Sequence, residues 1–365
     1  MARKGMIIKM KVGFITSGGD CQSLNAAMRG VAKTLYRNDK NTEIIGILDG
    51  YKGLIYGNSK KMKPCDFSGI LTLGGTIIGT SRQPFKEMGN PGEGGVDKVA
   101  AMKENYKKWG LDCLVILGGN GTQKTANLLS GEGLNVVSLP KTIDNDLWGT
   151  DMTFGFHSAV DIATQAIDNI HSTATSHGRV FIVEVMGHKT GWMTLYAGVA
   201  GGADIILVPE ISYDIKKVAA AINERIKNGN KFSILAVAEG AISKEDAQLK
   251  KKELKKKKAA EAYPSVAYEL ADKLSECVDR EIRVAIPGHT QRGGNPNYYD
   301  RLLATRFGIK AAELIAKGDY GKMVALEDGK ITAVPLSEIA GKLKVLSPDN
   351  EIIAQAKEIG ICFGD

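Results

Sequence analysis

Short apolar segments alternate with longer amphipathic segments along most of the chain. The short ones are rich in Val and Ile, as buried strands are, and the longer ones place apolar residues at helical spacing. Strands that alternate with helices predict an α/β fold with a doubly wound, mostly parallel sheet. The predicted strands are Val12–Ile15, Ile44–Leu48, Cys113–Leu117, Val136–Leu139, Val180–Val185, Asp204–Val208, Phe232–Val237 and Arg283–Ile286, and the predicted helices include Leu24–Tyr36, Gly95–Trp109, Ser158–Ser172 and Ile215–Lys227.

Glycine or polar residues follow seven of these predicted strands. In open α/β sheets, ligands bind beyond the carboxyl ends of the strands. The pattern therefore predicts one large binding site, or two sites that face each other. The segments that follow the strands are Thr16–Asp20, Asp49–Tyr51, Gly118–Thr122, Pro140–Asp146, Met186–His188, Ala238–Gly240 and Pro287–Gly294.

Three glycine-rich loops point to phosphate groups as the ligand. They are Ser17–Asp20, Gly74–Arg82 and Gly118–Thr122, and the first is followed directly by a predicted helix. Backbone N–H groups at the start of a helix face anions well, and the helix dipole adds to the attraction. None of the three has the spacing of a P-loop or of a dinucleotide-binding loop.

The segment Pro140-Lys-Thr-Ile-Asp-Asn-Asp146 carries the residue types that phosphoryl transfer needs. Asp144 and Asp146 could act as a base and a metal ligand, and Lys141 could contact the transferred oxygens. On spacing alone, an Asx turn with helix-capping aspartates is an open alternative. His289 and Arg292 on a further glycine-rich loop add an imidazole and a guanidinium suited to phosphate.

Arg179, Arg283 and Glu239 lie beside or at the ends of apolar strands, where a charge needs a partner or a ligand. The sequence leaves open which of the two each one has. The histidines lack the spacing and the neighbouring carboxylates of a zinc site, so we expect no zinc.

Length and charge limit the possible domain organisation and the possible partners of the chain. A chain of 365 residues suggests two domains. The net charge of +7 is mostly local, because residues 244–258 hold eight lysines and three acidic residues. No aromatic residues interrupt this run, so we expect a solvated helix within an insertion at about 243–262, and no nucleic-acid partner.

The chain also lacks the marks of membrane proteins and secreted proteins. No apolar run approaches the length of a membrane span, and lysines interrupt the first eleven residues, which argues against a signal peptide. Five scattered cysteines fit a reducing compartment. We therefore predict a cytoplasmic protein with no membrane partner.

Taken together and in their order, the motifs resemble the phosphofructokinase family. Ser-Gly-Gly-Asp, Gly-Thr-Ser-Arg, Pro-Lys-Thr-Ile-Asp-Asn-Asp, Val-Met-Gly, Ala-Glu-Gly and Gly-His-x-Gln-Arg-Gly-Gly occur at family-like intervals over nearly the whole chain. The resemblance implies a glycolytic kinase that transfers a phosphoryl group to the 1-hydroxyl of fructose 6-phosphate. It also implies two doubly wound domains with the active site in the cleft between them. We expect residues 1–155 and 291–341 to bind the donor, and residues 156–290 and 342–365 to bind the sugar phosphate.

The resemblance also implies a role for individual residues. Asp144 would be the general base, with Thr142, Arg82 and Lys141 at the transferred phosphoryl group. Asp146 and Asn120 would hold Mg²⁺. The donor, ATP, would contact Gly19, Tyr51, Arg82, Gly118, Gly119, Asn120, Gly121 and Thr122. The sugar phosphate would contact Thr142, Asp144, Met186, Gly187, His188, Glu239, His289 and Arg292, with Arg179 and Arg283 reaching it from a neighbouring subunit of a homodimer or homotetramer.

Two positions depart from the family pattern. Asn120 replaces a metal-binding aspartate, and an amide is a weaker ligand. His188 replaces an arginine, which removes a permanent cation. Because of these departures, a second hypothesis remains open, in which the chain is a non-catalytic, nucleotide-binding regulatory subunit.

The donor is decided by two further positions. In the pyrophosphate-dependent branch of the family, an aspartate stands where this chain has Gly121, and it repels the α-phosphate of ATP. Gly121 therefore favours ATP, whereas Lys141 is also a feature of the pyrophosphate branch. We predict ATP, with pyrophosphate as the alternative.

Allosteric control is predicted to be weak or absent. Arg29, Lys33 and Glu210 match effector-binding positions of short bacterial members, but His171 and Asn230 stand where cations are expected. A cluster that lacks these cations holds a polyphosphate poorly.

Overall fold

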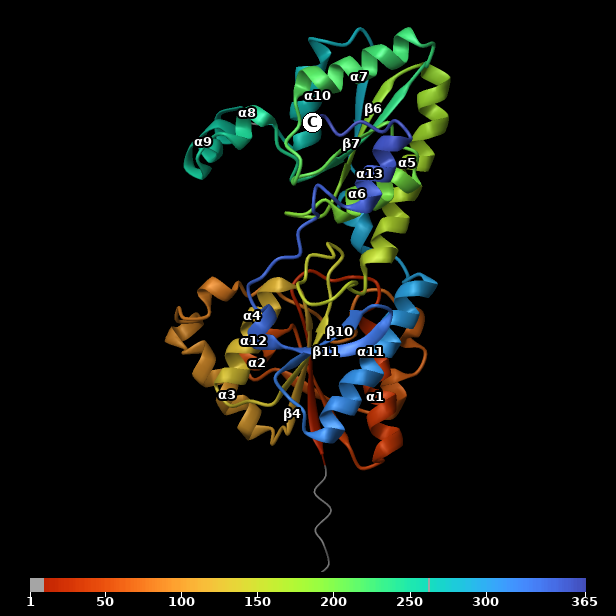
Figure 1. Cartoon of the computed structure of the whole chain (residues 1–365). Coiled ribbons are helices and arrows are strands. Elements are labelled where there is room, and N and C mark those ends of the chain that lie inside the picture. Colours follow the sequence, from red (N-terminus) through yellow and green to blue (C-terminus); the bar gives the residue numbers. More distant parts are fainter. Residues whose placement is uncertain (1–9, 262) are drawn as a thin grey trace, which may run out of the picture. The chain divides into compact units, whose positions relative to one another are not determined.

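The computed structural model describes residues 10–261 and 263–365 (Figure 1). The predicted absence of a signal peptide concerns residues 1–9, which lie outside the described residues, as does residue 262 at the end of the predicted insertion. The chain divides into two compact units. Unit 1 comprises the chain up to Thr142, then Asp146–Ser158 and Arg292–Leu343, and unit 2 comprises Ile143–Asn145, Ala159–Gln291 and Lys344–Asp365. The assignment of donor and acceptor to these units stays a prediction.

Unit 1 is built on a seven-stranded sheet in the order β11-β10-β5-β4-β1-β2-β3. Its inner strands are parallel, and each edge is closed by one antiparallel strand, β3 or β11. The two edge strands and β10 were not among the predicted strands. The strands are β1 (Lys11–Ser17), β2 (Glu43–Ile47), β3 (Ser59–Met62), β4 (Cys113–Gly118), β5 (Val136–Pro140), β10 (Lys322–Glu327) and β11 (Lys330–Pro335).

Helices cover both faces of this sheet, with α1 and α11 on one face and α2, α3 and α4 on the other (Figure 1). Because both faces are covered, every residue of β4 is buried, which explains its unbroken apolar sequence. Gly30 of α1 and Gly308 of α11 let the two helices approach closely, since a Cβ on Gly308 would lie 2.5 Å from the carbonyl oxygen of Ala27. The helices are α1 (Leu24–Asn38), α2 (Tyr51–Tyr56), α3 (Lys98–Lys108), α4 (Asn120–Gly131), α11 (Tyr298–Lys317) and α12 (Leu336–Ile339).

Unit 2 is built on a four-stranded parallel sheet in the order β7-β8-β6-β9. The two inner strands are fully buried, whereas the edge strand β9 is partly exposed. The strands are β6 (Val180–Val185), β7 (Ile205–Leu207), β8 (Ser233–Ala238) and β9 (Ile282–Ala285), and the helices around them are α5 (Phe156–His177), α6 (Trp192–Ala200), α7 (Ile215–Lys227), α10 (Val266–Ser275) and α13 (Glu351–Glu358).

The lysine-rich segment forms two helices, where the sequence predicts one. They are α8 (Lys244–Ala247) and α9 (Lys251–Glu261), and they stand away from the sheet of unit 2 (Figure 1). No residue of α9 is buried, which fits the predicted solvated face. No helix in the described part of the chain is both long enough and apolar enough to span a membrane.

Candidate active site

In unit 1, the loop after β1 and the loop that carries Gly79–Arg82 are hydrogen-bonded to each other. The N–H of Gly18 donates to the carbonyl of Ser81 (3.1 Å), and the Thr80 hydroxyl donates to the carbonyl of Gly18 (2.8 Å). Gly18 has a φ of 85°, which favours glycine. These bonds hold Arg82, an exposed side chain, beside the Ser-Gly-Gly-Asp loop.

The loop after β4 leads directly into α4, so this glycine-rich turn lies at a helix N-terminus. Gly119 is the N-cap residue and has no side chain to occupy the first N–H groups of the helix. Gly118 is required by a close contact, since a Cβ there would lie 2.2 Å from Cγ2 of Thr122. An anion would therefore meet free N–H groups and the positive end of the helix dipole.

Two buried side chains brace this loop from behind. The Tyr51 side chain is fully buried, and its hydroxyl donates to the carbonyl of Thr122 (3.0 Å). Burial raises the pKa of Tyr51 well above its ordinary value, so the hydroxyl remains a donor. Gln123, which the sequence reasoning missed, donates to the carbonyls of Gly118 (2.9 Å) and Leu139 (3.3 Å) and thus links the ends of β4 and β5. The sequence offers no signal for this role, because the burial of Gln123 is visible only in the structure.

In the segment that follows β5, one side chain is accessible and its neighbours are buried. From Lys141 to Leu147, Asp144 alone is not buried. Lys141 Nζ donates to the carbonyl of Gly19, which joins this segment to the first glycine loop. The sequence therefore folds so that Asp144 is the accessible carboxylate and Asp146 the buried one.

Backbone contacts fix the conformation of this segment. The Thr153 hydroxyl donates to the carbonyl of Thr142 (2.8 Å), and the Thr190 hydroxyl donates to the carbonyl of Asp144 (3.2 Å). Asn145 has a φ of 50°, in the left-handed region that asparagine tolerates, and its side chain accepts from Lys344 (2.9 Å).

Arg292 belongs to unit 1 and lies against the first glycine loop. Its Nη1 donates to the carbonyl of Asp20 (3.1 Å), and a Cβ on Gly19 would lie 2.9 Å from the same nitrogen. The structure therefore brings Arg292 together with the predicted donor residues.

Unit 2 holds a second group of predicted site residues, built around Glu239. Its Oε1 atom accepts the N–H groups of Gly187 (3.3 Å) and His188 (2.7 Å). Gln291, another residue that the sequence reasoning missed, accepts the N–H of Met186 (3.2 Å). Together these bonds shape the loop after β6.

The two arginines of unit 2 have a protein partner. Arg179 and Arg283 both form ion pairs with Glu281, at 2.5 Å for Arg179. A hydrogen bond from Arg179 holds the pKa of Glu281 below its ordinary value. The sequence left open whether a side chain or a ligand meets these charges, and in the isolated chain it is a side chain. His289 is exposed on the short helix Gly288–Arg292.

The two predicted magnesium ligands both belong to unit 1, and their side chains carry the oxygen atoms that Mg²⁺ prefers. Asn120 donates through Nδ2 to the carbonyl of Lys342 (2.7 Å), so its amide oxygen is the atom that could bind a metal ion. Asp146 supplies a carboxylate from the neighbouring segment. Mg²⁺ prefers oxygen ligands and keeps waters or phosphate oxygens around it, so two protein ligands suffice. Within the described residues there is no cluster of three or more His, Cys, Asp or Glu side chains for a metal.

The predicted residues thus fall into two groups. Unit 1 carries Gly19, Tyr51, Arg82, Gly118–Thr122, Lys141, Thr142, Asp146 and Arg292, whereas unit 2 carries Asp144, Arg179, Met186–His188, Glu239, Arg283 and His289. The short segment 141–146 contributes residues to both.

The comparison with known families decides the identity of the fold. Residues 11–315 match the family model described as phosphofructokinase. The chain belongs to the phosphofructokinase family. All the motifs that carry the resemblance in the sequence lie inside this range.

Close relatives of this phosphofructokinase chain extend over nearly its full length. It is 57% identical over 358 residues, 97% of each chain, to a protein of Spirochaeta thermophila named ATP-dependent 6-phosphofructokinase. It is 48% identical to ATP-dependent 6-phosphofructokinase 3 of Bacteroides thetaiotaomicron, over 97% of this chain and all of the relative.

A solved structure confirms the phosphofructokinase fold. The phosphofructokinase of Saccharomyces cerevisiae superposes with a TM-score of 0.78 at 31% identity. The match covers 90% of this chain and 45% of the yeast chain, so this chain spans about half the length of that relative.

Proposed function

We propose that the chain is an ATP-dependent 6-phosphofructokinase, which transfers the terminal phosphoryl group of ATP to the 1-hydroxyl of fructose 6-phosphate. The observation that carries the proposal is the 57% identity, over 97% of both chains, to a relative named for this activity. The retained residues of both groups support it. The work of a glycolytic enzyme also agrees with a cytoplasmic location.

Unit 1 is the proposed donor unit. The first N–H groups of α4, behind Gly118 and Gly119, would receive phosphate oxygens of ATP. Arg82 and Thr142 would contact the transferred phosphoryl group, where fixed positive charge and donors stabilise the transition state. Lys141, held at the carbonyl of Gly19, would keep this part of the loop in place and add positive charge.

Asp144 is the proposed general base. Its carboxylate would accept the proton of the sugar's 1-hydroxyl as the oxygen attacks phosphorus. The segment supports this role, because it is buried on both sides of Asp144 and hydrogen-bonded at Thr142 and Asp144 itself. A fixed backbone holds the base in one position without reorganisation.

Asn120 and Asp146 are the proposed magnesium ligands. When bound, Mg²⁺ would supply positive charge to the donor's phosphate oxygens. Because Asn120 is uncharged, Asp146 would supply most of the free energy with which the protein's own side chains bind Mg²⁺.

Unit 2 is the proposed acceptor unit. Met186, Gly187, His188, Glu239 and His289 of this unit would bind the sugar phosphate. Arg179 and Arg283 would act on a neighbouring subunit's sugar phosphate. Their position on the exposed side of the edge strand β9 and beside β6 agrees with a homo-oligomer.

Gly121 supports ATP over pyrophosphate. A Cβ on this residue would meet no atom within 4 Å, so the space beside the loop is open for a larger donor. The test is a paired assay with fructose 6-phosphate and magnesium, with ATP in one series and pyrophosphate in the other.

We expect turnover with ATP and at most a trace with pyrophosphate. Turnover with pyrophosphate alone would make Lys141, and not Gly121, the residue that selects the donor. If neither donor gives turnover but ATP binds measurably, the result would favour the alternative that Asn120 and His188 raise, namely a non-catalytic regulatory subunit.

A further inference from the structure

The inserted helices of unit 2 border a hollow that also contains a proposed substrate residue. We call residues 243–261 the arm. The hollow has a volume of about 280 Å³, near the lower end of small-molecule pockets. Lys258 and Glu261 of the arm are part of its lining, and so is Glu239. The complete lining is Glu184, Glu239, Lys258, Glu261, Tyr263, Pro264, Ser265, Val266 and Glu269.

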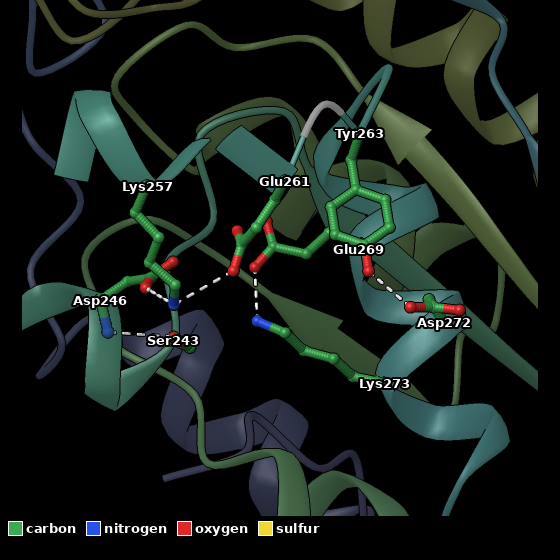
Figure 2. Close-up of polar contacts among 8 residues, drawn as sticks. All are labelled: Ser243, Asp246, Lys257, Glu261, Tyr263, Glu269, Asp272 and Lys273. Atoms are coloured by element: carbon green, nitrogen blue, oxygen red, sulfur yellow. Dashed lines mark hydrogen bonds and ion pairs between the residues drawn. The ribbon is translucent and has the colours of Figure 1, made fainter. Parts of the chain in front are cut away.

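The arm is held in place by an ion pair whose carboxylate is buried. Lys257 Nζ of α9 lies 2.5 Å from a carboxylate oxygen of Asp246 in α8, and Asp246 is only 2% exposed (Figure 2). The backbone N–H of Asp246 donates to the hydroxyl of Ser243, the N-cap of α8. Lys257 also lies 3.7 Å from Glu261, one turn further along α9. The arm therefore has a defined position beside the hollow although no residue of α9 is buried.

Three glutamates of the hollow lie outside the arm. Each already accepts a hydrogen bond or forms an ion pair, and each can accept further hydrogen bonds. Glu184 accepts the N–H of Ala267 at the start of α10 (2.8 Å), and Glu269 pairs with Lys273 (2.5 Å; Figure 2). In the described part of the chain, both bonds to Glu239 end at Oε1. An ionised carboxylate has about four acceptor positions, so donors such as sugar hydroxyls find free acceptors here.

Tyr263 gives the hollow an aromatic wall. Its hydroxyl donates to Asp272 of α10 (2.5 Å), which fixes the direction of the ring (Figure 2). Tyr263 is also part of the lining. Fixed aromatic rings beside hydrogen-bonding groups are common in small-molecule sites, because the ring packs on the apolar face of the ligand.

Lys258 is the cation of the hollow. It is exposed, and the ion pairs of the described residues do not include it. Its neighbours in the lining are four glutamates. Four carboxylates repel a bare anion, whereas a phosphorylated sugar offers hydroxyl donors to the carboxylates and an anionic group to the lysine.

We propose that the arm forms a wall of the acceptor site and that Lys258 and Tyr263 bind the phosphorylated sugar there together with Glu239. This inference rests on the proposed function, because it takes Glu239 as a sugar-binding residue. It gives the lysine-rich insertion a role in binding substrate, carried by one of its lysines.

The test is Lys258→Ala, with Lys256→Ala as the matched control. Two residues apart on a helix lie about 200° around its axis, so Lys256 faces away from the side of Lys258. We expect Lys258→Ala to raise the KM for fructose 6-phosphate about tenfold, which is the loss of one charge-assisted contact of about 1.4 kcal/mol. The KM for ATP and kcat should stay at the wild-type values, and Lys258→Arg should restore most of the affinity.

A second variant and a binding measurement separate the inference from the proposed function. Tyr263→Leu should raise the KM for fructose 6-phosphate without altering kcat, and calorimetry should show weaker sugar-phosphate binding in both variants. Equal KM values for wild type, Lys258→Ala and Lys256→Ala would overturn the inference while leaving the kinase activity established. A wild-type protein that shows no kinase activity would instead overturn the proposed function.

Discussion

Gly121 is the residue that we propose selects the phosphoryl donor of this chain. It lies in the first turn of α4, and a side chain there would point into open space. An aspartate at this position would therefore fold without strain, and an acidic residue in the first turn of a helix is favourable. The identity of residue 121 is thus free to serve the choice of donor.

We predict that Gly121→Asp impairs the use of ATP without lowering stability. The new carboxylate would repel the α-phosphate of ATP, so kcat/KM for ATP should fall on the order of a hundredfold, or about 2.7 kcal/mol. Steady-state kinetics with ATP and pyrophosphate and a thermal melt would measure both effects. Gly121→Ala is the control, and an equal loss in Gly121→Ala would mean that bulk, and not charge, is responsible.

Asp144 carries the second prediction at this scale. Asp144→Asn removes the proton acceptor and keeps the shape of the side chain, so kcat should fall roughly 10²- to 10⁴-fold. The KM for fructose 6-phosphate should change little, since the asparagine preserves hydrogen bonds to the sugar. Near-wild-type turnover in this variant would show that another group accepts the proton.

The sequence could predict the position of candidate residues at strand ends, but it could not predict what surrounds them. The motifs placed Asp144, Gly118 and Glu239 at strand ends, because strand ends are visible in the apolar pattern. Tyr51, which the resemblance predicted to contact the donor, is fully buried in this structure. Gln123 and Gln291 were missed because a polar residue gives no sign in the sequence that it is buried and hydrogen-bonded to the backbone.

At the scale of elements, strands with an apolar sequence were predicted well, whereas both edge strands of unit 1 and its inner strand β10 were missed. β6 begins and ends where the apolar run predicted, since it is buried on both faces. β3 has the sequence Ser-Lys-Lys-Met and its two lysines are exposed, so no apolar pattern marks it. The lysine run predicted one helix, but the chain breaks between α8 and α9 and folds back, which buries Asp246 against Lys257.

We predict that Lys257→Met loosens the arm. The substitution leaves the carboxylate of Asp246 buried without its ion-pair partner. Loss of a fully buried pair costs about 3–5 kcal/mol, and because the Lys257 side chain is 34% exposed we expect roughly 1–2 kcal/mol. Amide hydrogen exchange in α8 and α9 should accelerate. Lys255→Met, on the opposite side of α9, is the control, and equal exchange in both variants would contradict a structural role for the pair.

The same ion pair predicts a dependence on pH. The hydrogen bond to Asp246 raises the pKa of Lys257 above its ordinary value of 10.5. A cation with a raised pKa stabilises the folded arm fully below that ordinary value, and the contribution is lost as the pH rises through the raised pKa. The contribution of this pair to the exchange protection of the arm should therefore be constant around neutral pH and decline above about pH 10.5.

At the scale of the whole molecule, the proposed homo-oligomer is testable by mixing two inactive variants. Asp144→Asn removes the base of its own subunit, and Arg283→Ala removes a side chain proposed to serve the neighbour. In a mixed dimer, one site then keeps both groups. Random pairing of co-expressed variants should restore about a quarter of the wild-type activity. Each variant alone is the control, and a mixture with no more activity than its components would show that Arg283 serves its own subunit.

The class of fold was the most predictable feature of the whole molecule. Alternation of strands and helices indicated a doubly wound α/β protein, and the phosphofructokinase fold confirms it. The way the chain passes back and forth between the two units was not visible in the apolar pattern, because pairing between β5 and β10 joins residues 185 positions apart. Only the resemblance to a family suggested such discontinuous domains.

The order of the segments in unit 1 has a consequence for how the protein forms during synthesis. Its sheet needs β10 and β11, and α1 needs α11, yet these elements follow the whole of residues 159–291. A nascent chain that has reached residue 291 therefore holds most of unit 2 while the β5 edge of unit 1 and one flank of α1 are uncovered. Such exposed edges and apolar surfaces recruit chaperones or aggregate. The ribosome-bound chain is thus most vulnerable during translation of residues 292–335, before β10 can pair with β5 and before α11 can pack against α1.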